Sequence, residues 1–370
     1  MTKELESIIL ATEYDLTHFP DRSVKNRLKS IVKKALGRGG MIKDPIYWPN
    51  GLLAKGLIDA ANYLEDDKTN KEGILSYLES YIDVWTRTGG RVEYIDDAIF
   101  GEVLLELEKK ELAARVYDNL LATRKDFEGS IVYRPKQDNN YILADMVGMV
   151  CSFLSSYGVR YNAIDAIDLA NKQIVNFIKH GIDDVTGLPY HGYSLGTRGD
   201  MGDGHGEMCL GLVGWGRAVG WIMRGTAGYL AALKEHINDS CVSYKSDYED
   251  VSKFFIKLSE TCISYLRDDN LWGWELPAKK GHVDTSASAI IIEAMETGLR
   301  AGIYDETPSA KEKVYLCTQK GVEALMSHCQ NGKIMDSLSE SLDFAVHYQV
   351  FGHYPWGQGP SLSAICKKMD

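Results

Sequence analysis

The chain has 370 residues, 45% hydrophobic and 25% charged, a composition typical of a globular protein. Its formal net charge is −11, and no block of Lys and Arg or basic face interleaved with aromatic residues is present, which argues against a nucleic-acid partner. No apolar run approaches the roughly 18–20 residues that span a bilayer, so no membrane partner is expected.

The cysteines and the first residues bear on cellular location. Seven cysteines are scattered without a C-x-x-C motif, which fits reduced thiols better than a disulfide framework or a zinc site. The segment MTKELESIILATEYDL carries acidic residues where a secretory signal would carry basic ones. We therefore predict a cytoplasmic protein without a metal or another cofactor.

Apolar residues recur at helical spacing along most of the chain. In the segment 22–40, Val24, Leu28 and Ile31 share one face, and Gly37 is placed to end the helix. The short segment GSIVYR (129–134) is the best candidate for a strand. Further helices are predicted at 52–66, 72–90, 96–125, 144–158, 163–181, 218–236, 250–266, 284–302 and 309–328.

Roughly twelve helices joined by short Gly-rich turns predict an all-α protein. No Pro/Ser-rich linker divides the chain, so residues 1–370 are expected to form a single domain. A solenoid of helical hairpins should repeat one motif at a fixed period, and no such motif is found. The unlike, aromatic-rich loops favour an (α/α)6 barrel, in which six hairpins close into a ring around a carbohydrate-type site.

The stretch VGWGRAVGW (213–221) places Arg217 between Trp215 and Trp221, with three glycines close by. Glycine lets a backbone approach a ligand, while indole faces and a guanidinium suit a flat, polar, negatively charged one. A packed helix start with one buried cation–π pair explains the same residues equally well.

Acidic residues stand at two predicted helix starts. Asp145 is the only charge in YILADMVGMVCSF, where it is either a helix cap or a carboxyl that apolar surroundings keep protonated for proton donation. Asp96 and Asp97 open a second helix, where two acids commonly serve as a cap and a complement to the helix dipole.

Several Gly-rich segments are expected to form loops. GLPYHGYS (187–194), NLWGWELP (270–277), GHVDTSASA (281–289) and HYPWGQGPSLSA (353–364) combine glycine with aromatic, His or hydroxyl side chains and suggest the rim of a pocket. GDMGDGHGEM (199–208) matches no calcium or zinc pattern and is interpreted as a loop. Its charged residues are Asp200, Asp203, His205 and Glu207.

The order of these motifs resembles the unsaturated glycuronyl hydrolases of glycoside hydrolase families 88 and 105, which include unsaturated rhamnogalacturonyl hydrolases. LADM-x-x-M, TGLPYHGYS, GWGRAVGW, HVDTSASA and PWGQG correspond to the family forms D-T-x-x-M, T-G-L-x-x-H-G-Y, W-x-R-G-N-G-W, E-T-S-A-T-A and G-Q-G. The resemblance runs from about Asp96 to the C-terminus and implies an (α/α)6 barrel.

The resemblance also assigns site residues. It implies that Asp145 is catalytic, with Asp96 favoured over Asp97 as the second acid. The predicted substrate-binding residues are Asp97, His191, Trp215, Arg217 and Trp221, together with Trp48, which precedes the matched region.

The sequence departs from the family pattern at four positions. Ala218 and Val219 replace Gly-Asn, Met146 replaces Thr, and Asp284 replaces Glu. These departures leave the choice of substrate open.

The implied activity is removal of a 4,5-unsaturated uronic acid from the non-reducing end of a lyase-generated acidic oligosaccharide, most readily of rhamnogalacturonan type. Asp145 would protonate C4 and then activate the water that adds at C5, with Asp96 in support. Trp215 and Trp221 would wall the sugar ring, and Arg217 would either bind the substrate or hold loops in place. The alternatives are a conventional two-carboxylate glycosidase and a non-catalytic helical-repeat binding protein.

Overall fold

The computed structural model describes residues 1–18, 45–133, 139–196, 206–341, 344 and 348–368. The helix predicted at 22–40 lies outside these residues. Twelve α-helices are found within the described part of the chain, with short β-strands between some of them.

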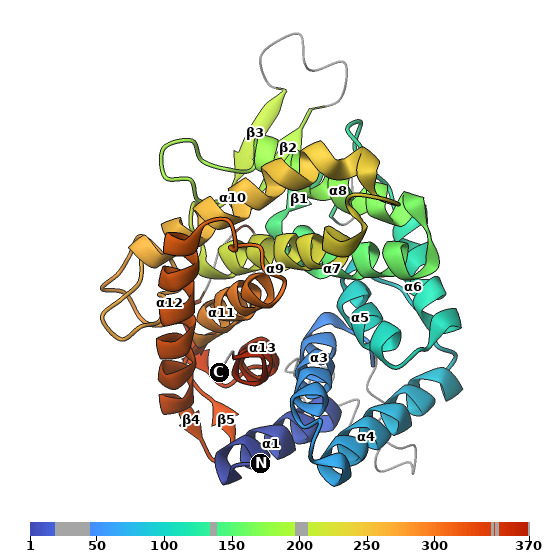
Figure 1. The fold of residues 1–370 in the computed structure, drawn as a ribbon, viewed down its shortest axis with the longest axis vertical. Helices are drawn as coiled ribbons and strands as arrows, with labels where there is room; N and C mark the ends of the chain where they lie inside the picture. The colour runs from blue at the N-terminus through green and yellow to red at the C-terminus, as the bar shows by residue number, and fades with distance from the viewer. Residues whose placement is uncertain (19–44, 134–138, 197–205, 342–343, 345–347, 369–370) are drawn as a thin grey trace.

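Six helices form a closed inner ring (Figure 1). Each inner helix packs on the inner helix that follows it in the chain, and the last packs back on the first. The predicted (α/α)6 barrel is therefore confirmed, and an open solenoid is contradicted. The inner helices are α3 (Trp48–Tyr63), α5 (Ala98–Glu106), α7 (Ala144–Tyr161), α9 (Gly216–Leu233), α11 (Thr285–Arg300) and α13 (Pro355–Lys367).

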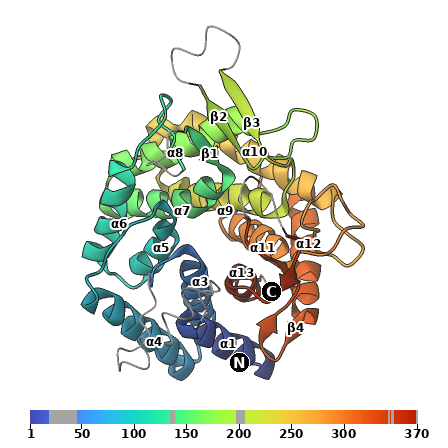
Figure 2. The ribbon, with the colours of Figure 1, turned by 180° about the vertical axis from the view of Figure 1, so that it is seen from behind.

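Six further helices surround this ring (Figure 2). Helices of the two layers differ in how much of their surface is apolar. Inner α11 buries every residue from Thr285 to Glu296, whereas outer α12 buries one stripe that includes Val314 and Leu325. The outer helices are α1 (Lys3–His18), α4 (Lys68–Arg87), α6 (Lys110–Ala122), α8 (Ile164–His180), α10 (Lys245–Ser264) and α12 (Pro308–Ser327).

Short antiparallel strands are added between the helices. β1 (Tyr141–Leu143), β2 (Gly192–Leu195) and β3 (Glu207–Leu210) form one sheet. β4 (Cys329–Gln330) pairs with β5 (Lys333–Ile334), and β6 (Ser337–Leu338) pairs with β7 (Phe351–Gly352). Three 3-10 turns, η1 (Ile95–Asp97), η3 (Lys234–His236) and η4 (Val242–Tyr244), complete the described elements.

The structure corrects several predicted elements. The segment 96–125 is two helices, because Glu108 adopts a left-handed φ of 57° between α5 and α6. GSIVYR is not one of the named strands; within it Ile131 makes a single bridge with Lys125. α1 was not predicted, and most of the predicted loop 353–364 is helix α13, which starts at Pro355, a residue suited to the first turn.

Glycine allows the inner ring to close between α13 and α3. A Cβ on Gly56 would lie 2.6 Å from the carbonyl oxygen of Gly359. A Cβ on Gly359 would lie 2.3 Å from the carbonyl oxygen of Leu52. Both obstacles are backbone atoms, so the two helices reach this separation because neither carries a side chain there.

The PWGQG motif contributes a scaffold residue at the same place. Buried Gln358 donates to the Thr12 hydroxyl at 3.1 Å and to the Gly332 carbonyl at 2.9 Å. It also accepts a hydrogen bond from the Ile334 amide at 2.9 Å. Gln358 therefore ties α1 and the β4–β5 hairpin to α13.

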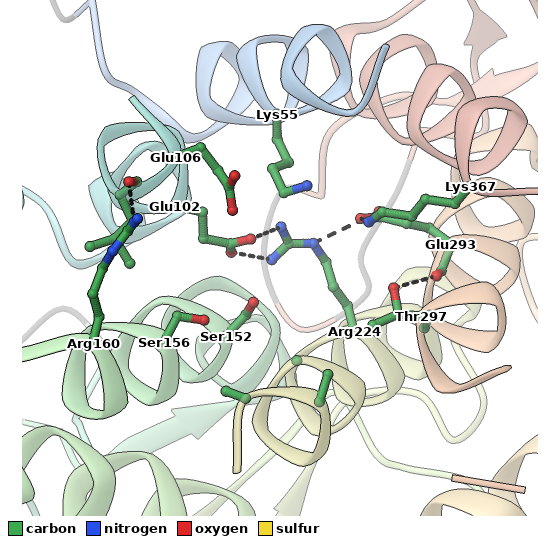
Figure 3. Close-up of a pocket in the computed structure, with 15 residues that line it drawn as sticks. Lys55, Glu102, Glu106, Ser152, Ser156, Arg160, Arg224, Glu293, Thr297 and Lys367 are labelled. Atoms are coloured by element: carbon green, nitrogen blue, oxygen red, sulfur yellow. Dashed lines mark hydrogen bonds and ion pairs between the residues drawn. The ribbon is translucent and has the colours of Figure 1, made fainter. Parts of the chain in front are cut away.

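Paired charges hold the ring together where the inner helices end. A cavity of about 340 Å³ lies among their C-terminal halves (Figure 3). Arg224 pairs with Glu102 at 2.9 Å, and Lys367 pairs with Glu293 at 3.0 Å. Asp59 pairs with Lys367 at 3.2 Å, and Arg224 also lies 3.9 Å from Glu293, so one network joins α3, α5, α9, α11 and α13.

Asp59 makes this network sensitive to acid. Burial alone would raise the pKa of Asp59, but the charges of Lys367 and Lys55 lower it to about 2. A carboxyl whose pKa is lowered by folding adds stability above its unfolded pKa, and that stability is lost as the pH falls toward the folded value.

We predict that Asp59→Asn lowers the free energy of unfolding by about 3 kcal/mol at pH 7, because Lys55 and Lys367 lose a buried partner. The difference from the wild type should shrink as the pH falls from 4 toward 2. Urea unfolding across this pH range measures it. Asp168→Asn, which removes an exposed pair with Lys172, is the control and should change stability by less than about 1 kcal/mol. A pH-independent difference at Asp59 would contradict the prediction.

Candidate active site

The inner helices begin around one mouth of the barrel. A second cavity, of about 140 Å³, lies there and is lined by residues from their first turns and from nearby loops. It brings together all but one of the predicted site residues: Trp48, Asp96, Asp145, His191, Trp215, Arg217 and Trp221. The exception is Asp97.

Asp145 stands in the first turn of α7 and is not its cap. Leu143 occupies the cap position, and no side chain caps this helix. Asp145 Oδ2 lies 3.2 Å from Nε2 of His191, within hydrogen-bonding distance. The carboxyl therefore faces the cavity with a histidine beside it, and the interpretation of Asp145 as a capping residue is contradicted.

Strand pairing places His191 beside Asp145. Leu143 of β1 is opposite Gly192 of β2, and the Ala144 amide donates to the His191 carbonyl at 2.9 Å. The His191 ring packs on Trp215 with 4.4 Å between centroids. Its other nitrogen, Nδ1, is buried and has no hydrogen-bond partner among the described residues. The imidazole is thus held in place with Nε2 directed at the carboxyl.

The two neighbouring acids, Asp96 and Asp97, have different surroundings. Asp97 is fully buried, and its Oδ2 accepts hydrogen bonds from the amides of Glu93 at 3.0 Å and Tyr94 at 3.1 Å. It holds the turn that leads into α5 and does not line the cavity. Asp96 lines the cavity together with Asp145.

Arg217 is held by protein groups. Its guanidinium donates to the carbonyls of Leu338 at 2.9 Å and Ser339 at 2.7 Å. It lies 3.8 Å from the Asp284 carboxylate and 4.9 Å from the centre of the Trp215 ring. Only 3% of the surface of Arg217 is exposed. Its contacts hold the segment that follows α12, which is the second of the two roles considered for Arg217 from the sequence.

Three tryptophans, Trp48, Trp215 and Trp221, line the cavity. Trp215 and Trp221 are each 1% exposed. Trp221 packs so closely on α7 that a Cβ on Gly148 would lie 2.6 Å from its ring. Trp48 is partly exposed and meets Trp221 edge to face, with centroids 6.3 Å apart. Flat apolar walls of this kind suit a sugar ring.

The sequence departures at Ala218 and Val219 lie behind the cavity. Both side chains are fully buried in α9 and do not line the site. Met146, in contrast, is a lining residue. Asp284 caps α11 by accepting from the Ser286 amide at 3.0 Å, and it pairs with Arg217, so it belongs to the support of the site.

Sequence reasoning missed several lining residues, among them Tyr47, Tyr133, Glu340, Ser341 and Phe344. Tyr47 could have been found, because it adjoins Trp48. Burial, with a smaller effect from the charges of Asp96 and Glu340, raises the pKa of its hydroxyl to about 12, so the phenol stays protonated at neutral pH. No motif marks Glu340 or Phe344; Arg217 helps to hold the segment of Glu340 by bonding to the carbonyls of Leu338 and Ser339.

Of the acidic segment at 199–208, the structure describes only residues 206–208, and these do not line the cavity. Asp200, Asp203 and His205 lie outside the described residues, and Glu207 bonds to His180 at 3.0 Å. Among the residues that the structure describes, no group of three or more His, Cys, Asp or Glu side chains is arranged to hold a metal ion. None of the described helices has the length and apolar character needed to cross a bilayer.

A closed barrel whose mouth is lined by three carboxyls and by tryptophans is the arrangement expected of a barrel glycosidase. A family model for Glycosyl Hydrolase Family 88 matches residues 19–369. The chain belongs to this family. The closed ring and the family together exclude the alternative of a non-catalytic helical-repeat protein.

Solved structures agree on the fold. A family 105 glycoside hydrolase from C. acetobutylicum is 18% identical, with a TM-score of 0.70 over 94% of this chain and 99% of its own. An unsaturated glucuronyl hydrolase from Streptococcus agalactiae is 15% identical, with a TM-score of 0.67 over 99% of this chain and 92% of its own. Another unsaturated glucuronyl hydrolase, described as specific for heparin, is 14% identical, with a TM-score of 0.65 over 87% of this chain and 85% of its own. No curated protein sequence matches significantly.

We predict that Arg217→Lys loosens the segment 337–341, because a lysine cannot donate to both carbonyls in a fork. Hydrogen bonds to charged groups are worth about 1.5–3 kcal/mol, so the amides of Leu338 and Ser339 should exchange about tenfold faster or more. Hydrogen exchange read by mass spectrometry measures this. Arg87→Lys, on the exposed face of α4, is the control. Unchanged exchange together with a raised KM would instead identify Arg217 as a substrate contact.

Proposed function

We propose that this protein removes the 4,5-unsaturated uronic acid from the non-reducing end of small acidic oligosaccharides by hydrating the C4=C5 double bond. The observation that carries the proposal is the hydrogen-bonded pair of Asp145 and His191, which faces the same aromatic-walled cavity as Asp96. Membership of family 88 and the fold shared with unsaturated glucuronyl hydrolases support it.

In the proposed reaction, Asp145 donates a proton to C4, and positive charge develops at C5 and the ring oxygen. The resulting carboxylate takes a proton from the water that adds at C5. The product is a hemiketal, which opens to a ketone and releases the sugar attached at C1. General acid–base help of this kind is typically worth about 10²–10⁴ in rate.

Neighbouring residues support both proton transfers. His191 Nε2 fixes the orientation of the Asp145 carboxyl, which aims the proton. Asp96, which lines the same cavity, accepts a hydrogen bond from the attacking water or a ring hydroxyl. Trp215 and Trp221, both buried, provide apolar walls for the planar unsaturated ring.

The size of the cavity supports action at a chain end. At about 140 Å³ it is smaller than the ~300–1,000 Å³ of typical drug-sized ligand sites, so it suits one terminal ring.

We favour substrates of rhamnogalacturonan type, because the sequence motifs resemble those of the unsaturated rhamnogalacturonyl hydrolases. Packing of both α1 and α13 on α3 supports one catalytic domain over residues 1–370. Seven free cysteines support a cytoplasmic location.

We predict that the wild-type protein removes the ultraviolet absorbance of the double bond from an unsaturated rhamnogalacturonan disaccharide. Asp145→Asn should lower kcat/KM by about 10²–10⁴, because the amide cannot donate the proton. Asp96→Asn should lower it less, since Asp145 remains. Asp168→Asn on the surface of α8 is the control and should retain activity.

Two results would contradict this proposal. One is full activity of folded Asp145→Asn, with folding checked by its melting temperature. The other is release of nitrophenol from a saturated nitrophenyl uronide with no loss of the double bond from any unsaturated disaccharide, which would indicate a conventional two-carboxylate glycosidase.

A further inference from the structure

Glu340 is held at the rim of the cavity by a fixed backbone. The preceding residue, Ser339, donates its amide to the Val350 carbonyl at 2.9 Å, and its own carbonyl accepts from Arg217 at 2.7 Å. One residue earlier, the Leu338 amide donates to Asp284 Oδ1 at 3.0 Å. Glu340 lines the cavity and is exposed to solvent. Its carboxylate is therefore accessible to a ligand that enters the cavity.

The cavity carries more negative than positive charge. Its described lining includes three carboxyls, Asp96, Asp145 and Glu340, and two basic side chains, His191 and Arg217. Arg217 is paired with Asp284, and His191 bonds to Asp145. The lining thus has little positive charge left for a second acidic group on the substrate.

Depth separates Glu340 from the reacting groups. The His191 side chain is 4% exposed and that of Asp145 is 20% exposed, whereas Glu340 is an exposed residue. In the proposed function the terminal unsaturated ring must reach Asp145. The sugar that leaves then points outward, toward Glu340.

We propose that Glu340 selects the leaving sugar, accepting hydrogen bonds from the hydroxyls of an uncharged sugar and repelling a sulfate or carboxylate at that place. This inference rests on the proposed function. Hydroxyl donors bind an ionised carboxylate more strongly than a neutral acceptor. A sulfate ester removes such a donor and adds a negative charge, so both effects weaken binding of the sulfated sugar beside Glu340.

The test uses an unsaturated uronyl–rhamnose disaccharide with and without one sulfate ester on the rhamnose. We expect the wild type to favour the unsulfated form by about tenfold or more in kcat/KM, because like charges a few ångströms apart at a protein surface repel on this scale. In Glu340→Gln the preference for the unsulfated form should narrow to about threefold or less. The kcat/KM for the unsulfated sugar should fall modestly. Raising the salt concentration should narrow the wild-type preference as well.

Glu312→Gln, an exposed position on outer helix α12, is the matched control and should keep the wild-type ratio. A preference of the wild type for the sulfated sugar, or an unchanged ratio in Glu340→Gln, would overturn the role of Glu340 while leaving the proposed function in place. Absence of absorbance loss with both sugars would overturn the proposed function and this inference with it.

Discussion

The close contact between α13 and α3 is the constraint on which the site depends. Because Gly56 and Gly359 carry no side chains, the last inner helix can pack against the first, and the ring closes. Closure brings the first turns of the inner helices to one mouth. Trp48 of α3, Asp96 before α5, Asp145 of α7 and Arg217 of α9 come together there, although the chain separates them widely.

Closure of parallel helices also gives the barrel two electrically different ends. Helix N-termini carry partial positive charge and favour anions, and C-termini favour cations. The active-site mouth holds Asp96, Asp145 and Glu340 together with Arg217, whereas at the far end Arg224 and Lys367 are balanced by the carboxyls of Glu102 and Glu293. The positive helix ends help to keep several carboxyls in one small cavity, and they also favour an anionic substrate ring.

The sequence predicts this architecture where local pattern decides it. Helical periodicity located most helices, and the motifs around Asp145, His191 and Trp215 marked the site because chemistry-bearing residues there stand next to glycines and helix starts. Helix α13 was missed since its glycines disfavour a helix locally, and contacts across the fold explain them: Gly359 packs on α3, and Gly357 packs on Ser337 of β6. The separate surroundings of Asp96 and Asp97, the occupied donors of Arg217 and the position of Glu340 depend on contacts across the fold, which periodicity and motif spacing do not encode.

The central claim is that Asp145 delivers a proton to C4 before the leaving sugar departs. It is tested most directly by running the reaction in D₂O and following it by NMR at early times, with an unsaturated disaccharide as substrate. If Asp145 protonates C4, we expect one deuterium at C4 in a single configuration, and the double bond should be lost no later than the leaving sugar is released. Release of that sugar while the C4=C5 bond of the uronic acid is still intact would contradict it.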